Sequence, residues 1–236
     1  MNRSSIAFTA LALLKWQTFA HAAQAPGEDW PQLGAYREQN RQLGPPAPGE
    51  DRVVFFGDSI TYAWSRQGRE FFPGTPYVNR GLKGQTTPQL LVRFRQDVVQ
   101  LRPKAVVILA GTNDIAGNTG PSTLEMIEDN LMSMAEIARM NGIRVVLCSV
   151  LPAADYPWRQ GLHPSGRIVE LNAWMKDYAQ ASGLVYLDYY SAMAGKDGEL
   201  KPELTTDGVH PNDAGYAVMT PLAARAITAA LAGSAR

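Results

Sequence analysis

The chain has 236 residues, a length at which one α/β domain can bury a large core. Lys and Arg together number 22, as do Asp and Glu, so no excess of charge favours nucleic acid or an anionic membrane surface as a partner. The single cysteine, Cys148, excludes an intramolecular disulfide and a cysteine-based metal cluster, and its apolar neighbours predict a buried core residue.

The beginning of the chain predicts a signal peptide over residues 1–25. Arg3 supplies a positive charge, residues 6–14 form a short apolar segment, and Ala22 or Ala25 provides a small residue at a cleavage position. The apolar segment is too short to span a bilayer, so we expect a periplasmic or secreted protein with no stable membrane insertion. An uncleaved N-terminal tail is the alternative.

An N-terminal extension is expected over residues 26–51. Residues 29–43 are compatible with one short helix that has Pro31 near its first turn. Residues 44–51 contain three prolines and are typical of a stiff connector.

Residues 52–236 alternate between strand and helix patterns and predict the main domain. The strands are expected at 53–56, 77–79, 105–110, 144–150 and 184–187, and most of these runs are apolar throughout. Helices are expected within 87–101, 121–142, 164–183 and 212–231, where Pro221 should kink or divide the last one. This alternation predicts a doubly wound α/β domain with a parallel sheet covered on both faces.

Polar residues and glycines follow the first three predicted strands. Asp58-Ser59 follows the first, the segment 79–84 with Gly81 the second, and the segment 111–114 with Asn113 the third. The carboxyl ends of parallel strands open on one edge of a sheet, where ligands bind in such folds. Farther along the chain, Asp207 and His210 lie three positions apart, just before the last helix.

These residue types supply each part that serine hydrolysis needs. Ser59 would be the nucleophile, His210 the base that takes its proton, and Asp207 the acceptor that orients the imidazole. The backbone N–H groups of Ser59 and Gly81 and the amide of Asn113 would stabilise the oxyanion of the tetrahedral intermediate.

Each residue also has a structural explanation. Ser59 or Asp58 could cap a helix, Gly81 could be a turn glycine, and Asn113 could bond its own backbone. Residues 207–210 could form a plain turn that carries a surface histidine. Helix capping and turn formation are the better explanations for Ser59 and Gly81 taken alone, but capping does not explain the whole ordered set.

Four segments of the chain, "FFGDSIT", "NRGLKGQTT", "LAGTNDI" and "DGVHPNDAGY", resemble in order the four sequence blocks of the SGNH (GDSL-type) hydrolases. The resemblance implies a flavodoxin-like α/β/α sandwich of three layers around a five-stranded parallel sheet. It assigns the nucleophile to Ser59, the oxyanion hole to Ser59, Gly81 and Asn113, and the acid–base pair to Asp207 and His210. Within the family, the chain looks most similar to bacterial esterases related to platelet-activating-factor acetylhydrolases and lysophospholipase-like enzymes.

Five further residues are candidates for substrate binding. Asp58 and Arg80 neighbour the predicted catalytic segments, and Tyr156, Trp158 and His163 belong to a loop that follows the fourth predicted strand. A surface loop with two packed aromatic residues is the alternative for this last group. His163 has no aspartate three positions away, so we expect His210, not His163, to be the base.

We therefore expect a serine esterase that hydrolyses short-chain acyl esters, acetyl esters above all, through an acyl-enzyme and without a metal or cofactor. The expected partner is a small-molecule or glycan ester whose leaving group is a carbohydrate hydroxyl, a lysophospholipid or an aryl alcohol. Two alternatives remain: an acyltransferase of the same fold, and a non-catalytic module that binds glycans.

Overall fold

The computed structural model describes residues 29–65 and 68–233. The predicted signal peptide, residues 1–25, lies outside the described residues, and the described part of the N-terminal extension begins at Asp29.

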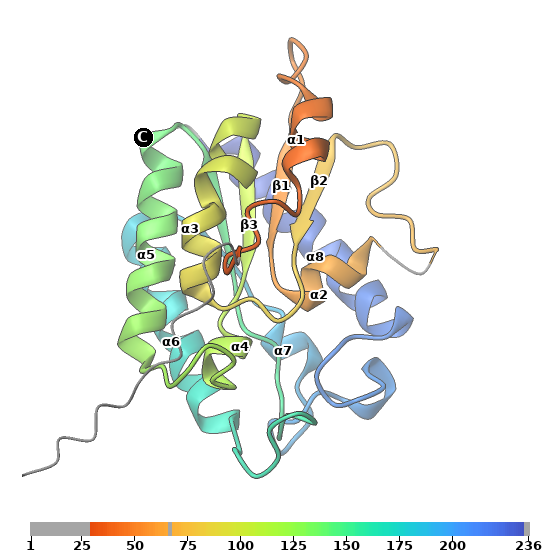
Figure 1. Cartoon of the computed structure of the whole chain (residues 1–236). Helices are drawn as coiled ribbons and strands as arrows, with labels where there is room; N and C mark the ends of the chain where they lie inside the picture. Colours follow the sequence, from red (N-terminus) through yellow and green to blue (C-terminus); the bar gives the residue numbers. More distant parts are fainter. Residues whose placement is uncertain (1–28, 66–67, 234–236) are drawn as a thin grey trace, which may run out of the picture.

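Five strands form one parallel sheet, as predicted (Figure 1). The strands are β1 Val53–Gly57, β2 Tyr77–Gly81, β3 Ala105–Leu109, β4 Arg144–Cys148 and β5 Val185–Leu187. Their order in the sheet is β2-β1-β3-β4-β5, which is the flavodoxin-like order. The strand order reverses at β1, so the connections that follow β1 and β3 run on opposite faces of the sheet. A crevice therefore forms at the carboxyl ends of these two strands.

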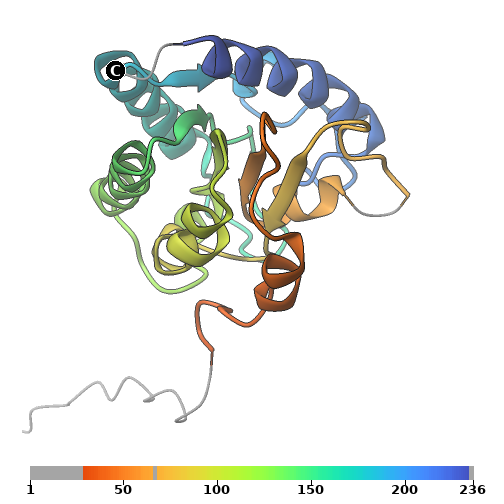
Figure 2. The ribbon, with the colours of Figure 1, turned by 90° about the horizontal axis from the view of Figure 1, so that it is seen from above.

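Helices cover both faces of the sheet and complete the three predicted layers. The helices are α1 Arg37–Leu43, α2 Ser59–Trp64, α3 Thr87–Asp97, α4 Thr112–Ile115, α5 Leu124–Met140, α6 Ser165–Ser182, α7 Tyr190–Met193 and α8 Asp213–Ala232, with short 3₁₀ helices η1 Val99–Leu101 and η2 Pro202–Leu204. In Figure 2, α3, α5 and α6 lie on one side of the sheet and α8 lies on the other.

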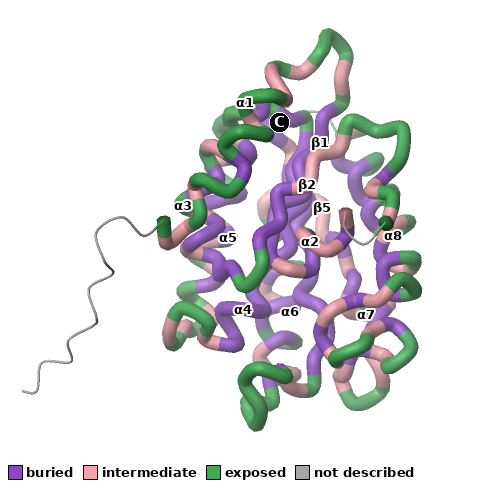
Figure 3. The backbone as a smooth tube through the Cα atoms, turned by 45° about the vertical axis from the view of Figure 1, so that its right-hand side comes forward, coloured by how far each residue is buried: buried purple, intermediate pink, exposed green. Residues whose placement is uncertain are grey.

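Alternate side chains of the strands belong to two apolar layers. Val54 and Phe56 pack in the layer formed with α3, α5 and α6, whereas Val53 and Phe55 pack in the layer formed with α2 and α8. Both sets of side chains are buried, and Figure 3 shows that the buried residues gather in the middle of the molecule. Burial on both faces is the physical reason why β1 and β3 are apolar throughout, whereas the edge strand β2 contains Asn79 and Arg80.

The N-terminal extension contains less helix than expected. The Asp29 carboxylate accepts hydrogen bonds from the N–H groups of Leu33 and Gly34 at 2.7 and 2.6 Å, which closes a turn, and Gln32 has a positive φ of 58°. The helix α1 therefore begins only at Arg37. Figure 1 shows α1 beside β2, where the extension covers the edge strand of the sheet.

Of the two effects expected of Pro221, a kink or a division of the last helix, division is not observed. The helix α8 is continuous from Asp213 to Ala232 and contains Pro221. Burial of Met219, Ala223 and Ile227 against the sheet holds the two halves together and offsets the lost hydrogen bond, which costs about 3 kcal/mol. By length and composition, α8 is the one helix among the described residues that could cross a membrane, but its buried face is that of a core helix.

Candidate active site

The predicted strand ends meet at one edge of the sheet. Gly57, the last residue of β1, pairs with Gly81 of β2 on one side and with Leu109 of β3 on the other. The three chain segments that follow these strands therefore start at the same level, which brings Ser59 and Asn113 into one region.

Ser59 is the first residue of α2, and Asp58 caps that helix. The Asp58 carboxylate accepts a hydrogen bond from the Ile60 N–H at 2.9 Å, and the Tyr216 hydroxyl donates to the Ile60 carbonyl at 2.8 Å. The capping explanation thus applies to Asp58 and leaves the Ser59 side chain free for other contacts. The Ser59 N–H is in the first turn of the helix, where backbone donors have no partner within the helix.

Ser59, His210 and Asp207 form a continuous chain of polar contacts. The Ser59 Oγ lies 2.9 Å from the His210 Nε2, and the His210 Nδ1 lies 2.7 Å from the Asp207 Oδ2. An ionised carboxylate can only accept, so the ring proton lies on Nδ1, and Nε2 is left to accept from the serine hydroxyl. A hydroxyl, an imidazole and a carboxylate in this order can activate a serine as a nucleophile.

The loop of Asp207 holds its carboxylate in the ionised form. Burial raises the pKa of Asp207, but hydrogen bonds from the His210 N–H, the His210 ring and the Val209 N–H outweigh it, and the net pKa lies below its ordinary value. The two backbone bonds to Oδ1 measure 2.7 and 2.9 Å. The Thr205 hydroxyl donates to the His210 carbonyl at 2.7 Å and closes the loop.

A cavity of about 520 Å³ opens over the Ser59 and His210 side chains. Polar and apolar groups both line it. Its walls are formed by Ser59, Ala63, Arg69, Lys83, Gly84, Asn113, Asn118, Trp158, Thr206, His210, Pro211 and Asn212. No group of three or more His, Cys, Asp or Glu side chains that could hold a metal occurs within residues 29–65 and 68–233.

A second cavity, of about 720 Å³, lies elsewhere in the molecule. Residues at the amino ends of β4 and β5 line it, among them Arg144 and Val185. Ligands of open parallel sheets bind at the carboxyl ends of the strands, so the smaller cavity over Ser59 is the candidate active site.

Asn113 lies in the wall of the cavity with its amide held in place. Its Nδ2 donates to the Gln85 carbonyl at 3.0 Å and lies 3.4 Å from the Asp58 Oδ2, while its Oδ1 accepts from Asn118 at 2.8 Å. The contact with Asp58 is long, so this N–H is the one that a ligand could engage.

The structure contradicts the expected role of Gly81. Its N–H donates to the Asn79 Oδ1 at 2.9 Å, and its carbonyl accepts from the Tyr36 hydroxyl, so both of its backbone groups are engaged away from the cavity. A Cβ here would lie 2.2 Å from the Tyr62 nitrogen. The glycine is required for close packing of β2 against α2, not for the approach of a substrate.

Gly84 lies where Gly81 was expected. It lines the cavity together with Ser59 and Asn113, and its φ of 72° is one that favours glycine. Among the described residues, no hydrogen bond occupies its N–H. The segment "NRGLKGQTT" contains both glycines, but the strand was expected to end at Asn79, two residues before its observed end.

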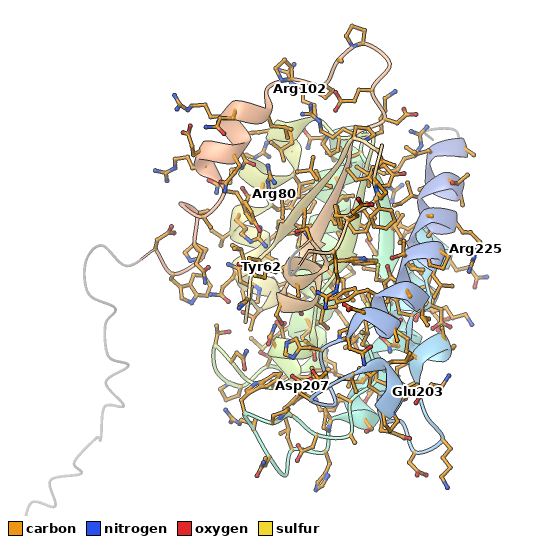
Figure 4. The ribbon with its side chains drawn as sticks, turned by 90° about the vertical axis from the view of Figure 1, so that its right-hand side faces the viewer. Tyr62, Arg80, Arg102, Glu203, Asp207 and Arg225 are labelled. Carbon is orange, nitrogen blue, oxygen red and sulfur yellow. The ribbon has the colours of Figure 1, made fainter. Side chains whose placement is uncertain are left out.

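Arg80 also lies away from the cavity. Its guanidinium is buried, donates to the Asn40 Oδ1 at 2.7 Å and lies over the Tyr36 ring. Figure 4 shows Arg80 near α1, well separated from Asp207. The expectation that Arg80 contributes to substrate binding is therefore not supported, because the N-terminal extension occupies its side chain.

The three candidates of the loop after β4 have different positions. Trp158 lines the cavity, and its ring centre lies 6.0 Å from that of His210. Tyr156 is buried behind Trp158, stacks on it at 5.1 Å and shares a hydrogen bond of 2.9 Å with the Thr112 hydroxyl. His163 is exposed and is not part of the cavity wall.

The family model described as GDSL-like lipase/acylhydrolase matches residues 55–218. This match covers more than half of the 236 residues, and the chain belongs to the GDSL-like lipase/acylhydrolase family, in agreement with an SGNH hydrolase fold. Membership places the chain among the hydrolases and supports esterase activity in general.

Three known proteins illustrate the similarity. The structure of a GDSL-like lipase from Bacteroides thetaiotaomicron is 44% identical and has a TM-score of 0.83, with 85% of this chain and 99% of that chain covered. An acetylxylan esterase from Xylanibacter ruminicola is 26% identical over 77% of this chain and 44% of its own length. An uncharacterized lipoprotein, YqeF, from Bacillus subtilis is 31% identical over 45% of this chain and 51% of its own length. The chain spans about half the length of the last two relatives or less.

Proposed function

We propose that the chain is a serine esterase that hydrolyses short acyl esters, acetyl esters above all, through an acyl-enzyme. The observation that carries this proposal is the chain of contacts from Ser59 through His210 to Asp207, at 2.9 and 2.7 Å, which opens into the cavity. The Ser59 hydroxyl lies in the cavity wall next to the His210 Nε2, a base that can activate it as a nucleophile.

In the first half of the reaction, the Ser59 Oγ attacks the ester carbonyl carbon while the His210 Nε2 takes the hydroxyl proton. Asp207 stabilises the imidazolium through Nδ1. The imidazolium then donates the proton to the leaving alcohol oxygen as the ester bond breaks. In the second half, water repeats the attack on the acyl-enzyme and releases the carboxylic acid and free Ser59.

Three donors would stabilise the negative oxygen of each tetrahedral intermediate. They are the N–H groups of Ser59 and Gly84 and the Nδ2 of Asn113, and all three residues lie in the wall of one cavity. Gly84 thus takes the role that was expected of Gly81. Removal of one such donor lowers kcat by about 100-fold or more in serine hydrolases.

The walls of the cavity favour a polar leaving group such as a carbohydrate. Thr206 offers a hydroxyl to the cavity, and Trp158 is 44% exposed, so its ring is accessible to a sugar. The Trp158 ring is held by its stacking on Tyr156 and by a 3.1 Å hydrogen bond to Asn118. The name of the acetylxylan esterase relative agrees with this substrate class.

The proposal is tested with purified protein, p-nitrophenyl esters of increasing chain length and acetylated xylan. We expect turnover to fall as the acyl chain lengthens, acetate to be released from the xylan, and Ser59→Ala to lose essentially all activity. A fluorophosphonate probe should label the wild-type protein and not Ser59→Ala. Near wild-type activity of Ser59→Ala would contradict the mechanism. Unlabelled, inactive wild-type protein would favour a glycan-binding module, and acetyl transfer to an added sugar in preference to water would favour an acyltransferase.

We also propose that the protein is exported. The composition of residues 1–25 supports this, as does the description of one relative as a lipoprotein. Mass spectrometry of the protein recovered from cell fractions would locate it and identify its first residue. A full-length protein in the cytoplasmic fraction would contradict export.

A further inference from the structure

Arg93 of α3 is a fully buried cation that the proposed mechanism does not use. Its side chain is 0% exposed and donates to four acceptors. The Nη1 donates to the Asp97 Oδ2 at 3.0 Å, and the Nη2 donates to the carbonyls of Gly57 and Arg80 at 3.1 and 2.8 Å. The Nε donates to the Oε1 of Gln85.

Three of these acceptors lie directly behind the candidate active site. The Gly57 carbonyl is at the end of β1, two residues before Ser59, and the Arg80 carbonyl is near the end of β2. Gln85 follows Gly84 in the loop that lines the cavity. One planar guanidinium therefore joins both strand ends to that loop, which a flexible ammonium could not do in the same geometry.

Gln85 passes this restraint to the Asn113 amide. The Gln85 side chain is 0% exposed and is held between the Arg93 Nε and the Pro31 carbonyl, to which its Nε2 donates at 2.9 Å. Its backbone carbonyl accepts from the Asn113 Nδ2 at 3.0 Å. The position of the Gln85 carbonyl therefore decides which way the second N–H of Asn113 points.

Stability alone is a weak explanation for these contacts. Taking the Arg93 guanidinium and the Asp97 carboxylate out of water costs free energy, and apolar residues of similar volume often stabilise a fold as well or better. Unlike an apolar side chain, the guanidinium of Arg93 holds its four acceptors in a fixed geometry.

We propose that Arg93, through Gln85, is a positioning residue for the oxyanion hole: it holds the Gln85 carbonyl that orients the Asn113 amide. This inference rests on the proposed esterase function. Neither side chain touches the substrate, so the effect should fall on kcat and leave KM for p-nitrophenyl acetate unchanged.

The test compares two glutamine variants of α3 and its preceding loop. Gln85→Met keeps the side-chain volume but removes the acceptor for the Arg93 Nε, and we expect kcat to fall by about 10-fold to 100-fold. The matched control is Gln96→Met, because Gln96 also donates to a carbonyl of the extension, that of Leu33 at 2.6 Å, but lies far along α3 from the cavity. Gln96→Met should keep the wild-type kcat.

A double-mutant cycle with Asn113→Ala separates positioning from a general loss of structure. With Asn113 already shortened, Gln85→Met should change kcat by no more than about threefold, because no amide is left for the Gln85 carbonyl to orient. Arg93→Lys is the second variant, to be used if Gln85→Met does not fold. It keeps a charge near Asp97 but loses the planar guanidinium, and its kcat should fall similarly.

A wild-type kcat in a folded Gln85→Met or Arg93→Lys variant would overturn the inference, as would full additivity in kcat or an equal loss in Gln96→Met. These outcomes are distinct from failure of the proposed function. That failure would appear in the wild-type protein and in Ser59→Ala, whatever the glutamine variants do.

Discussion

The carboxyl of Asp58 should make the stability of the protein fall with rising pH. Asp58 is 1% exposed, and its burial raises the pKa from 3.8 to about 7, despite the hydrogen bond from the Ile60 N–H, which lowers it. Below pH 3.8 the carboxyl is protonated in both the folded and the unfolded chain. Between pH 3.8 and about 7 the folded chain binds more protons than the unfolded chain, so raising the pH favours unfolding.

The size of this effect follows from the two pKa values. At 1.36 kcal/mol per pH unit, the interval from 3.8 to about 7 corresponds to about 4 kcal/mol of stability, which is present at pH 4 and lost by pH 8. Asp58→Asn should abolish this loss and still cap α2, since Asn and Asp are equally good N-caps. In the wild-type protein the Asn113 Nδ2 lies 3.4 Å from the Asp58 Oδ2, and the new amide would face it. This contact changes the stability of the variant by the same amount at every pH.

Urea unfolding of both proteins between pH 4 and pH 8, followed by tryptophan fluorescence, to which the buried Trp64 contributes, measures the difference directly. We expect the stability of Asp58→Asn relative to wild type to rise by about 4 kcal/mol across this range. Asp114, whose pKa is raised to about 6 by burial, is present in both proteins and enters the difference only through its charge interaction with Asp58. A difference that stays constant from pH 4 to pH 8 would refute the reasoning.

Two further predictions concern the cavity. Asn113→Ala should lower kcat for p-nitrophenyl acetate by about 100-fold with little change in KM, and an unchanged kcat would remove Asn113 from the oxyanion hole. Trp158→Ala should raise KM for acetylated xylan but not for p-nitrophenyl acetate, because the exposed ring is proposed to contact the sugar and not the acyl group. Equal KM changes for the two substrates would contradict this role.

Much of the fold could be predicted from local pattern. The apolar runs and the helical periodicities marked all five strands and the four long helices, because a parallel sheet buries both faces of each strand. Pro221 does not divide α8, because its local cost is offset by contacts of α8 with the sheet, which are made by residues distant in sequence.

The site could be predicted in part. Ser59, Asp207 and His210 stood out because short segments carry them, and the structure brings their side chains into contact. The choice between Gly81 and Gly84 could not be made, since it depends on where β2 ends. That end is set by the pairing of Gly81 with Gly57, a contact across 24 positions of the chain.

The amino-acid sequence by itself determined the alternation of strands and helices, the order of the four segments and the residues able to do acyl chemistry. Only the tertiary structure decided that the Gly81 N–H is already engaged, that Arg80 turns toward the N-terminal extension, and that Arg93 joins the ends of two strands. The physical reason is that a hydrogen-bonding group in the interior has several candidate partners along the chain. Which one it meets is settled by the strand register and the packing of the extension, and neither is a local property.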